Sequence, residues 1–158
     1  MKTTTRLLFV CLGNICRSPA AEGVMRHIVE REGFDDRIEC DSAGTYDGHA
    51  GELPDARMRR AAAARGYNLT HHSRLIHVGD FDCFDMILAM DDSNYERVHR
   101  MAPSLEAAAK IHRMTSFCRS HPGADHIPDP YYEGAAGFER VLDLLEDACT
   151  GLFDEIRR

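Results

Sequence analysis

Apolar residues gather in four short runs that are typical of buried β-strands. The runs cover residues 7–10, 38–40, 85–90 and 110–114, and polar residues interrupt the last of them. The Leu-Leu-Phe-Val run near the start and the Met-Ile-Leu-Ala-Met run in the middle contain no polar position. These two are therefore expected to be the most deeply buried strands.

Between the runs, apolar residues recur every three or four positions, which indicates amphipathic helices. The first two expected helices stop at Gly33 and Gly66, and the third ends before Pro103. The fourth has the strongest periodicity and follows a loop rich in His, Pro and Gly over residues 121–137. The expected helices cover residues 18–33, 54–66, 91–102 and 138–156.

Strands that alternate with helices predict an α/β fold, a three-layer doubly wound arrangement with a parallel sheet and helices on both faces. The length of 158 residues is most simply one domain, residues 1–158. Ligands of such sheets bind beyond the carboxyl ends of the strands. The segment after residue 10 is therefore the first place to look for a site.

The formal charge of −7 argues against binding to nucleic acid or to an anionic membrane surface. Residues 1–6 lead into an apolar run that is too short for a signal peptide or a membrane span, so no membrane insertion is expected. Cytoplasmic residence follows as the default, and the six cysteines are expected to be reduced thiols. The sequence does not indicate an oligomeric state.

The segment from Cys11 to Arg17 links the first strand to the first helix and carries the clearest chemistry. A loop that closes over a helix N-terminus points several backbone N–H groups at one anion. That helix end and a nearby cation favour a thiolate at Cys11, a nucleophile, and Arg17 can hold two phosphate oxygens at once. Gly13 allows close approach, Asn14 tolerates a left-handed backbone, and Ser18 can donate to the Cys11 sulfur. The expected phosphate-binding residues are Leu12, Gly13, Asn14, Ile15, Cys16, Arg17 and Ser18.

A second candidate is Asp129, which lies between Pro128 and Pro130 on a stiff, extended segment. Cleavage of a phosphate ester requires an acid that protonates the departing oxygen, and Asp129 can supply that proton. Tyr131 and Tyr132 follow it directly and could form the wall of a cleft for an aromatic ring.

The sequence Val-Cys-Leu-Gly-Asn-Ile-Cys-Arg-Ser-Pro at residues 10–19 and Asp-Pro-Tyr-Tyr at 129–132 resemble the low-molecular-weight protein tyrosine phosphatase family. The resemblance covers nearly the whole chain and implies a four-stranded parallel sheet. It also implies hydrolysis of phosphotyrosine and small aryl phosphates, in phosphoproteins or peptides, without metal or cofactor. Cys11 would form a cysteinyl-phosphate while Asp129 acts first as acid and then as base.

The resemblance further assigns supporting roles around the loop. Ser42, within the segment 41–44, and His71 would hold Asn14 and Ser18, and Asp91 matches a family position while also being suited to cap a helix. Leu12 and Ile15 would be outward-facing apolar side chains. Gly48 stands where an aromatic rim residue is common, and Tyr46 or His49 could replace it. The expected substrate rim is Tyr46, His49, Tyr131 and Tyr132.

Three other functions stay open at this point. An arsenate reductase on the same fold would need two further cysteines in one segment, and Cys83 has none beside it. Relatives that act on phosphoarginine are similar to this chain but carry Thr in place of Ile15. A phosphate-binding module without catalysis would not need both Cys11 and Asp129. Two modifications also stay open, namely a reversible Cys11–Cys16 disulfide and phosphorylation of Tyr131 or Tyr132.

Overall fold

Four parallel strands form one sheet in the order β2-β1-β3-β4. A computed structural model describes residues 4–158; residues 1–3, which belong to the segment screened for a signal peptide, lie outside the described part. All four predicted strands are present, and the predicted α/β fold is confirmed. The strands are β1 (Thr5–Cys11), β2 (Ile38–Gly44), β3 (Met86–Ala89) and β4 (Ile111–Arg113).

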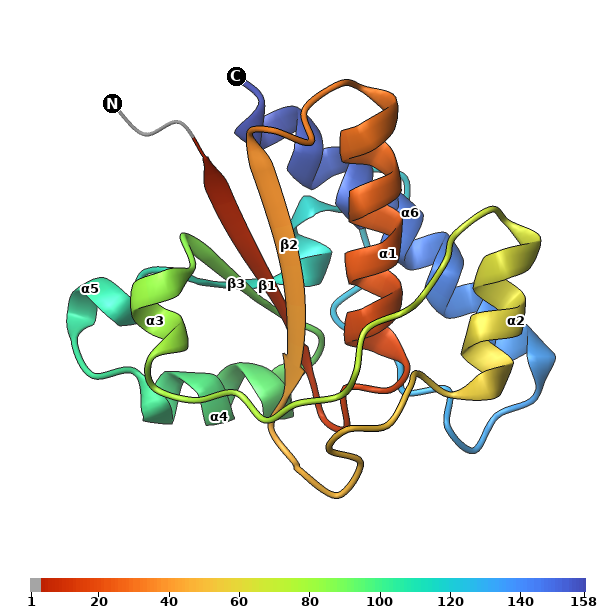
Figure 1. Cartoon of the computed structure of the whole chain (residues 1–158), viewed down its shortest axis with the longest axis horizontal. Helices are drawn as coiled ribbons and strands as arrows, with labels where there is room; N and C mark the ends of the chain where they lie inside the picture. Colours follow the sequence, from red (N-terminus) through yellow and green to blue (C-terminus); the bar gives the residue numbers. More distant parts are fainter. Residues whose placement is uncertain (1–3) are drawn as a thin grey trace.

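Helices cover both faces of the sheet (Figure 1). On one face lie α1 (Arg17–Arg31), α2 (Ala56–Ala64) and α6 (Ala135–Ile156), which share one apolar core with Leu7 and Phe9 of β1. On the other face, α3 (Asp80–Cys83), α4 (Asp92–Met101) and α5 (Leu105–Ala108) pack on Leu8 and Val10. Alternate residues of β1 therefore pack into the cores on opposite faces of the sheet, which explains its uninterrupted apolar run. Within residues 4–158, no helix is long and apolar enough to cross a bilayer.

Several boundaries differ from the predictions. The last helix begins at Ala135 instead of Phe138, so the loop expected over 121–137 is shorter, and β2 continues through Gly44. The helices α3, α5 and the 3₁₀ turn η1 (Met114–Phe117) were not predicted. Each of these spans only four residues, which is too short to show a helical period.

The strand order reverses direction at β1. From β1 the chain crosses to β2 on one side, then returns past β1 to β3 and β4 on the other. Such a reversal leaves a crevice at the carboxyl ends of the two central strands, here β1 and β3. The segment 11–17 leaves β1 at this point.

Asp147 of α6 anchors the segment that leads from η1 toward Asp129. Its carboxylate accepts hydrogen bonds from the backbone N–H groups of Arg119, Ser120 and His121 and from the His121 ring. Burial opposes the charge, but these donors outweigh it and lower the pKa of Asp147 to about 2. A carboxylate with a lowered folded-state pKa stabilises the fold above its unfolded pKa, about 3.9, and loses that effect as the pH falls toward 2.

We expect Asp147→Asn to lower the free energy of unfolding by about 1–2 kcal/mol at pH 7, because three backbone donors lose a charged acceptor. The difference from the wild type should shrink between about pH 4 and pH 2, as the wild-type carboxylate becomes protonated. Urea unfolding at several pH values measures this. Asp143→Asn, on the same helix and more exposed, is the matched control, and an equal loss in both variants would contradict the assignment.

Candidate active site

The loop between β1 and α1 rests directly on the end of β2. The Thr45 N–H donates to the Cys11 carbonyl at 3.0 Å, and the Tyr46 N–H donates to the Leu12 carbonyl at 2.9 Å. A Cβ atom at position 44 would lie 2.6 Å from the Leu12 carbonyl oxygen, so only glycine allows this approach. The residues at the end of β2 and directly after it therefore support the loop through backbone hydrogen bonds and close packing.

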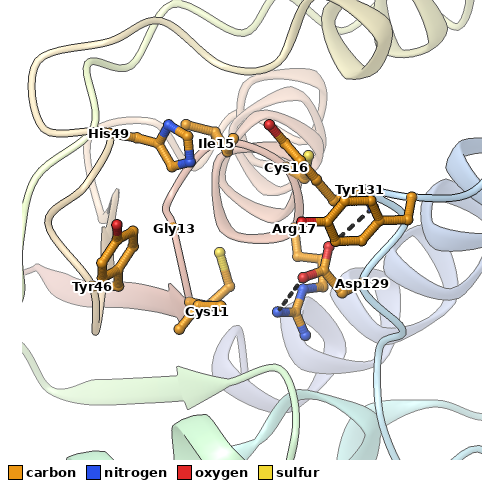
Figure 2. Close-up of a pocket in the computed structure, with 11 residues that line it drawn as sticks. Cys11, Gly13, Ile15, Cys16, Arg17, Tyr46, His49, Asp129 and Tyr131 are labelled. Carbon is orange, nitrogen blue, oxygen red and sulfur yellow. Dashed lines mark hydrogen bonds and ion pairs between the residues drawn. The ribbon is translucent and has the colours of Figure 1, made fainter.

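Cys11 is the last residue of β1, and its side chain faces into a pocket (Figure 2). Its Sγ lies 3.0 Å from the Ser18 Oγ in the first turn of α1, as the sequence predicted. Cys16 is different in character, because burial first, and then the charges of Asp55 and Cys11, raise its pKa far above the usual range. Cys16 is therefore a neutral thiol at neutral pH. The Cys11–Cys16 disulfide stays a prediction.

Asn14 holds the loop from inside. Its φ of 57° confirms the expected left-handed conformation. The side-chain amide donates to the Ser18 Oγ at 2.8 Å and to the Ser42 Oγ at 3.1 Å. The Asn14 Oδ1 lies 2.9 Å from the His71 Nε2. Ser42 and His71 thus lie where the family resemblance placed them, and His71 reaches Ser18 through Asn14.

A charged cluster lies behind this network. The Nδ1 of His71 is 3.5 Å from Glu22 and 3.4 Å from Asp41, and burial raises the pKa of Glu22. In the described part of the chain, these three residues are the group whose side chains could hold a metal ion. Arg26 and Arg74 already pair with Glu22 and Asp41, at 2.9 and 3.1 Å. The cluster therefore fits a support for the loop better than a cation site.

Arg17 joins three segments at the pocket floor. Its Nη1 donates to Asp91 Oδ2 at 2.7 Å and to the Ile127 carbonyl at 3.0 Å, and its Nη2 is 3.7 Å from Asp129 (Figure 2). Burial opposes the charge, but Cys11 and Asp91 outweigh it and raise the pKa of Arg17. Asp91 also caps α4 through the Asn94 N–H at 2.8 Å, which confirms the expected helix cap; its match to a family position stays a prediction.

One pocket of about 310 Å³ brings the sequence-predicted residues together. Cys11, Arg17 and Asp129 line it with the loop residues Leu12, Gly13, Ile15 and Cys16, and its rim carries Tyr46, His49, Tyr131 and Tyr132. Asn14, Ser18, Ser42, His71 and Asp91 lie outside the lining and act on it through the contacts above.

Two details of the rim change the predictions. The expectation that Ile15 faces outward is wrong, because only 8% of it is exposed and it packs into the core beside α1; Leu12 does face outward. At Gly48, an added Cβ atom would lie 2.2 Å from the Tyr46 ring. Tyr46 therefore occupies the space of the missing aromatic side chain, as one of the two predicted substitutes.

Sequence reasoning missed three contributors to the site. The Ser73 hydroxyl donates to the Gly13 carbonyl at 2.9 Å, and the Asp55 N–H donates to the Ile15 carbonyl at 2.7 Å. Arg57 lies over the Tyr131 ring at 5.3 Å. No local pattern marks these residues, because each contact depends on how distant segments fold beside the loop.

This geometry can be compared with known proteins. The sequence model of the low molecular weight phosphotyrosine protein phosphatase family matches residues 6–158. The chain belongs to this family. A putative low molecular weight protein-tyrosine-phosphatase from Synechocystis sp. is 45% identical over 96% of each chain. Members of the family are protein-tyrosine-phosphatases, which are hydrolases, and this confirms the predicted class of enzyme.

Solved structures of phosphatases share the fold of this chain. A protein tyrosine phosphatase from Entamoeba histolytica, crystallised with Hepes in its active site, has a TM-score of 0.94 and 44% identity. The alignment covers 98% of this chain and 97% of that one. An arginine phosphatase from Drosophila has a TM-score of 0.88 and 32% identity, and the alignment covers 96% and 98% of the two chains. Phosphatases for two different phosphoamino acids thus share this fold.

The cysteines of this phosphatase argue against arsenate reduction. Cys83 is exposed at the end of α3, on one face of the sheet. Cys118, the next in sequence, packs against the core on the opposite face, and the Cys149 thiol is buried in α6. A relay of disulfides would have to start at Cys11, and none of Cys83, Cys118 and Cys149 lines the pocket that Cys11 faces.

Proposed function

We propose that this single domain, residues 1–158, hydrolyses phosphotyrosine through a cysteinyl-phosphate on Cys11. The observation that carries the proposal is the convergence of a thiol, a guanidinium and a carboxyl group in one pocket. In the first step, the Cys11 sulfur attacks phosphorus and forms the S–P bond while the bond from phosphorus to the phenolic oxygen breaks. The proton of Asp129 moves to that oxygen, so tyrosine leaves uncharged.

In the second step, Asp129 is a carboxylate and takes a proton from water. The water oxygen attacks phosphorus, the S–P bond breaks, and inorganic phosphate and the Cys11 thiolate are formed. Arg17 and the N–H groups of residues 12–18 stabilise the equatorial oxygens in both steps. The Ser18 hydroxyl, 3.0 Å from the sulfur, stabilises the thiolate as it becomes the leaving group.

The substrate is a phosphotyrosine in a protein or peptide. Tyr46, His49 and Tyr131 form an aromatic wall around the pocket. The ring centres of Tyr46 and His49 are 6.3 Å apart and those of His49 and Tyr131 are 6.4 Å apart. Such a wall suits a planar phenyl ring. Position 15 carries the apolar residue Ile15, whereas relatives that act on phosphoarginine carry Thr at this position. The apolar side chain therefore favours phosphotyrosine. We also place the protein in the cytoplasm, since all six cysteines are free thiols.

Steady-state hydrolysis of two peptides, one with phosphotyrosine and one with phosphoarginine in the same sequence, tests the proposal. We expect turnover of the phosphotyrosine peptide in the presence of a metal chelator and a higher kcat/KM than for phosphoarginine. A higher kcat/KM for the phosphoarginine peptide would instead identify phosphoarginine as the substrate. Phosphate binding without turnover of either peptide would refute catalysis.

A further inference from the structure

Arg57 of α2 lies against the segment that carries Asp129. Its guanidinium is 5.3 Å from the centre of the Tyr131 ring and 4.9 Å from the centre of the Phe138 ring. Phe138 is a buried core residue of α6. A guanidinium between two aromatic rings gains cation–π and packing energy from both. Tyr131 is thereby connected to the body of the protein.

Asp55 fixes the direction of the Arg57 side chain. Its carboxylate accepts from the Arg57 Nε at 3.1 Å and from the Nη2 at 2.9 Å, a two-point contact. The hydrogen bond from Arg57 lowers the pKa of Asp55, so the pair is charged at neutral pH. The Asp55 N–H donates to the carbonyl of Ile15 at 2.7 Å. Arg57 is thus tied to the phosphate-binding loop through Asp55.

The backbone on either side of Asp129 has a separate anchor. On the N-terminal side, the Ile127 N–H donates to the Met90 carbonyl at 2.7 Å, and Arg17 bonds the Ile127 carbonyl at 3.0 Å. On the C-terminal side, the Tyr131 N–H donates to the Asp129 Oδ1 at 3.1 Å. The Asp129 carboxylate is 45% exposed and otherwise reaches Arg17 only at 3.7 Å, so its position depends on these anchors.

We propose that Arg57 is a positioning residue for Asp129, acting through Tyr131. The inference rests on the proposed function, because it concerns proton donation during ester cleavage. Arg57 holds the Tyr131 ring against α2 and α6, and the Tyr131 N–H holds the carboxyl group over the pocket. Loss of Arg57 leaves the nucleophile and the phosphate-binding groups in place but lets the acid drift from the leaving oxygen.

Leaving-group dependence tests this role. The quantity to compare is kcat/KM, which reports the steps up to departure of the leaving group and not the later hydrolysis of the cysteinyl-phosphate. We expect Arg57→Ala to lower kcat/KM about tenfold on phenyl phosphate, whose phenolate needs a proton. On 2,4-dinitrophenyl phosphate, whose leaving group needs none, the loss should be about twofold or less. Inhibition by inorganic phosphate should stay unchanged. Arg60→Ala, one turn along the exposed side of α2, is the matched control and should behave as the wild type on both esters.

Two further variants keep the test decisive. Arg57→Lys retains the positive charge but loses the planar guanidinium that binds Asp55 at two points. We therefore expect a larger loss on phenyl phosphate than on 2,4-dinitrophenyl phosphate, as for Arg57→Ala, but a smaller difference between the two. This variant provides the test if Arg57→Ala does not fold. In an Asp129→Ala background, Arg57→Ala should cost no more than about twofold, since the acid is already absent. Equal losses on both esters, or a full additional loss in that background, would overturn the inference. Failure of the wild type on both esters would instead refute the proposed function.

Discussion

Cys11→Ser is expected to abolish hydrolysis while phosphate binding survives. The hydroxyl of serine stays protonated at neutral pH, so the variant has no ionised nucleophile, and we expect kcat to fall by about 10⁴-fold or more. The groups that hold the anion do not change, because Arg17 is fixed by Asp91 and Ile127 and the loop by Asn14. Initial rates with phosphotyrosine peptide and calorimetric titration with inorganic phosphate measure the two properties separately.

Cys83→Ser is the matched control for this experiment. Cys83 is exposed on α3, far from the pocket lining, and its replacement should leave both rate and binding unchanged. Residual turnover in Cys11→Ser within about tenfold of the wild type would reject the cysteinyl-phosphate. Loss of phosphate binding together with turnover would show that the sulfur holds the loop together and would leave the nucleophile unassigned.

For Asp129→Ala, the expected loss depends on the ester. General acids contribute about 10²–10⁴ to rates, so kcat/KM for esters with basic leaving groups should fall by this factor. Activated esters should fall far less, because their leaving groups depart without a proton. A plot of log(kcat/KM), which is free of the later hydrolysis of the cysteinyl-phosphate, against leaving-group pKa should be nearly flat for the wild type and steep for the variant.

The chain offers a close control in Asp125→Ala. Asp125 lies four residues earlier in the same loop and pairs with His126, outside the active-site pocket. We expect it to leave the slope and the rates unchanged. If wild type and Asp129→Ala gave the same slope, Asp129 would not be the acid, and another proton source would have to be sought in the pocket.

The loop at residues 11–18 could be predicted from the sequence because its chemistry is contiguous. One strand, one glycine, one left-handed asparagine and one arginine specify both its shape and its charge. The helix cap at Asp91 was also accessible, because aspartate is favoured directly before a helix such as α4, whereas its place in the site was indicated by the family resemblance alone. His71 was identified through the family resemblance alone, since nothing nearby in the chain marks it among nine histidines.

Residues that act from neighbouring segments were not accessible in this way. Ser73 and Arg57 reach the site only because the chain between β2 and α3 passes beside the loop, and no period or motif reports that path. The outward orientation predicted for Ile15 failed for a related reason. A position in a loop says little about burial when a helix such as α1 packs against it. The parallel sheet could be anticipated from the alternation of strands and helices, but its strand order and the four-residue helices could not.

The position of the Tyr46 ring couples residue 46 to residue 48. Because that ring fills the space in which a side chain at residue 48 would begin, any larger residue at 48 requires the exposed Tyr46 ring to swing aside or to be replaced by a smaller one. A change at position 48 therefore also moves the aromatic wall at position 46. Substrate preference at this rim is thus expected to change through both positions together, while the reacting groups beneath them stay as they are.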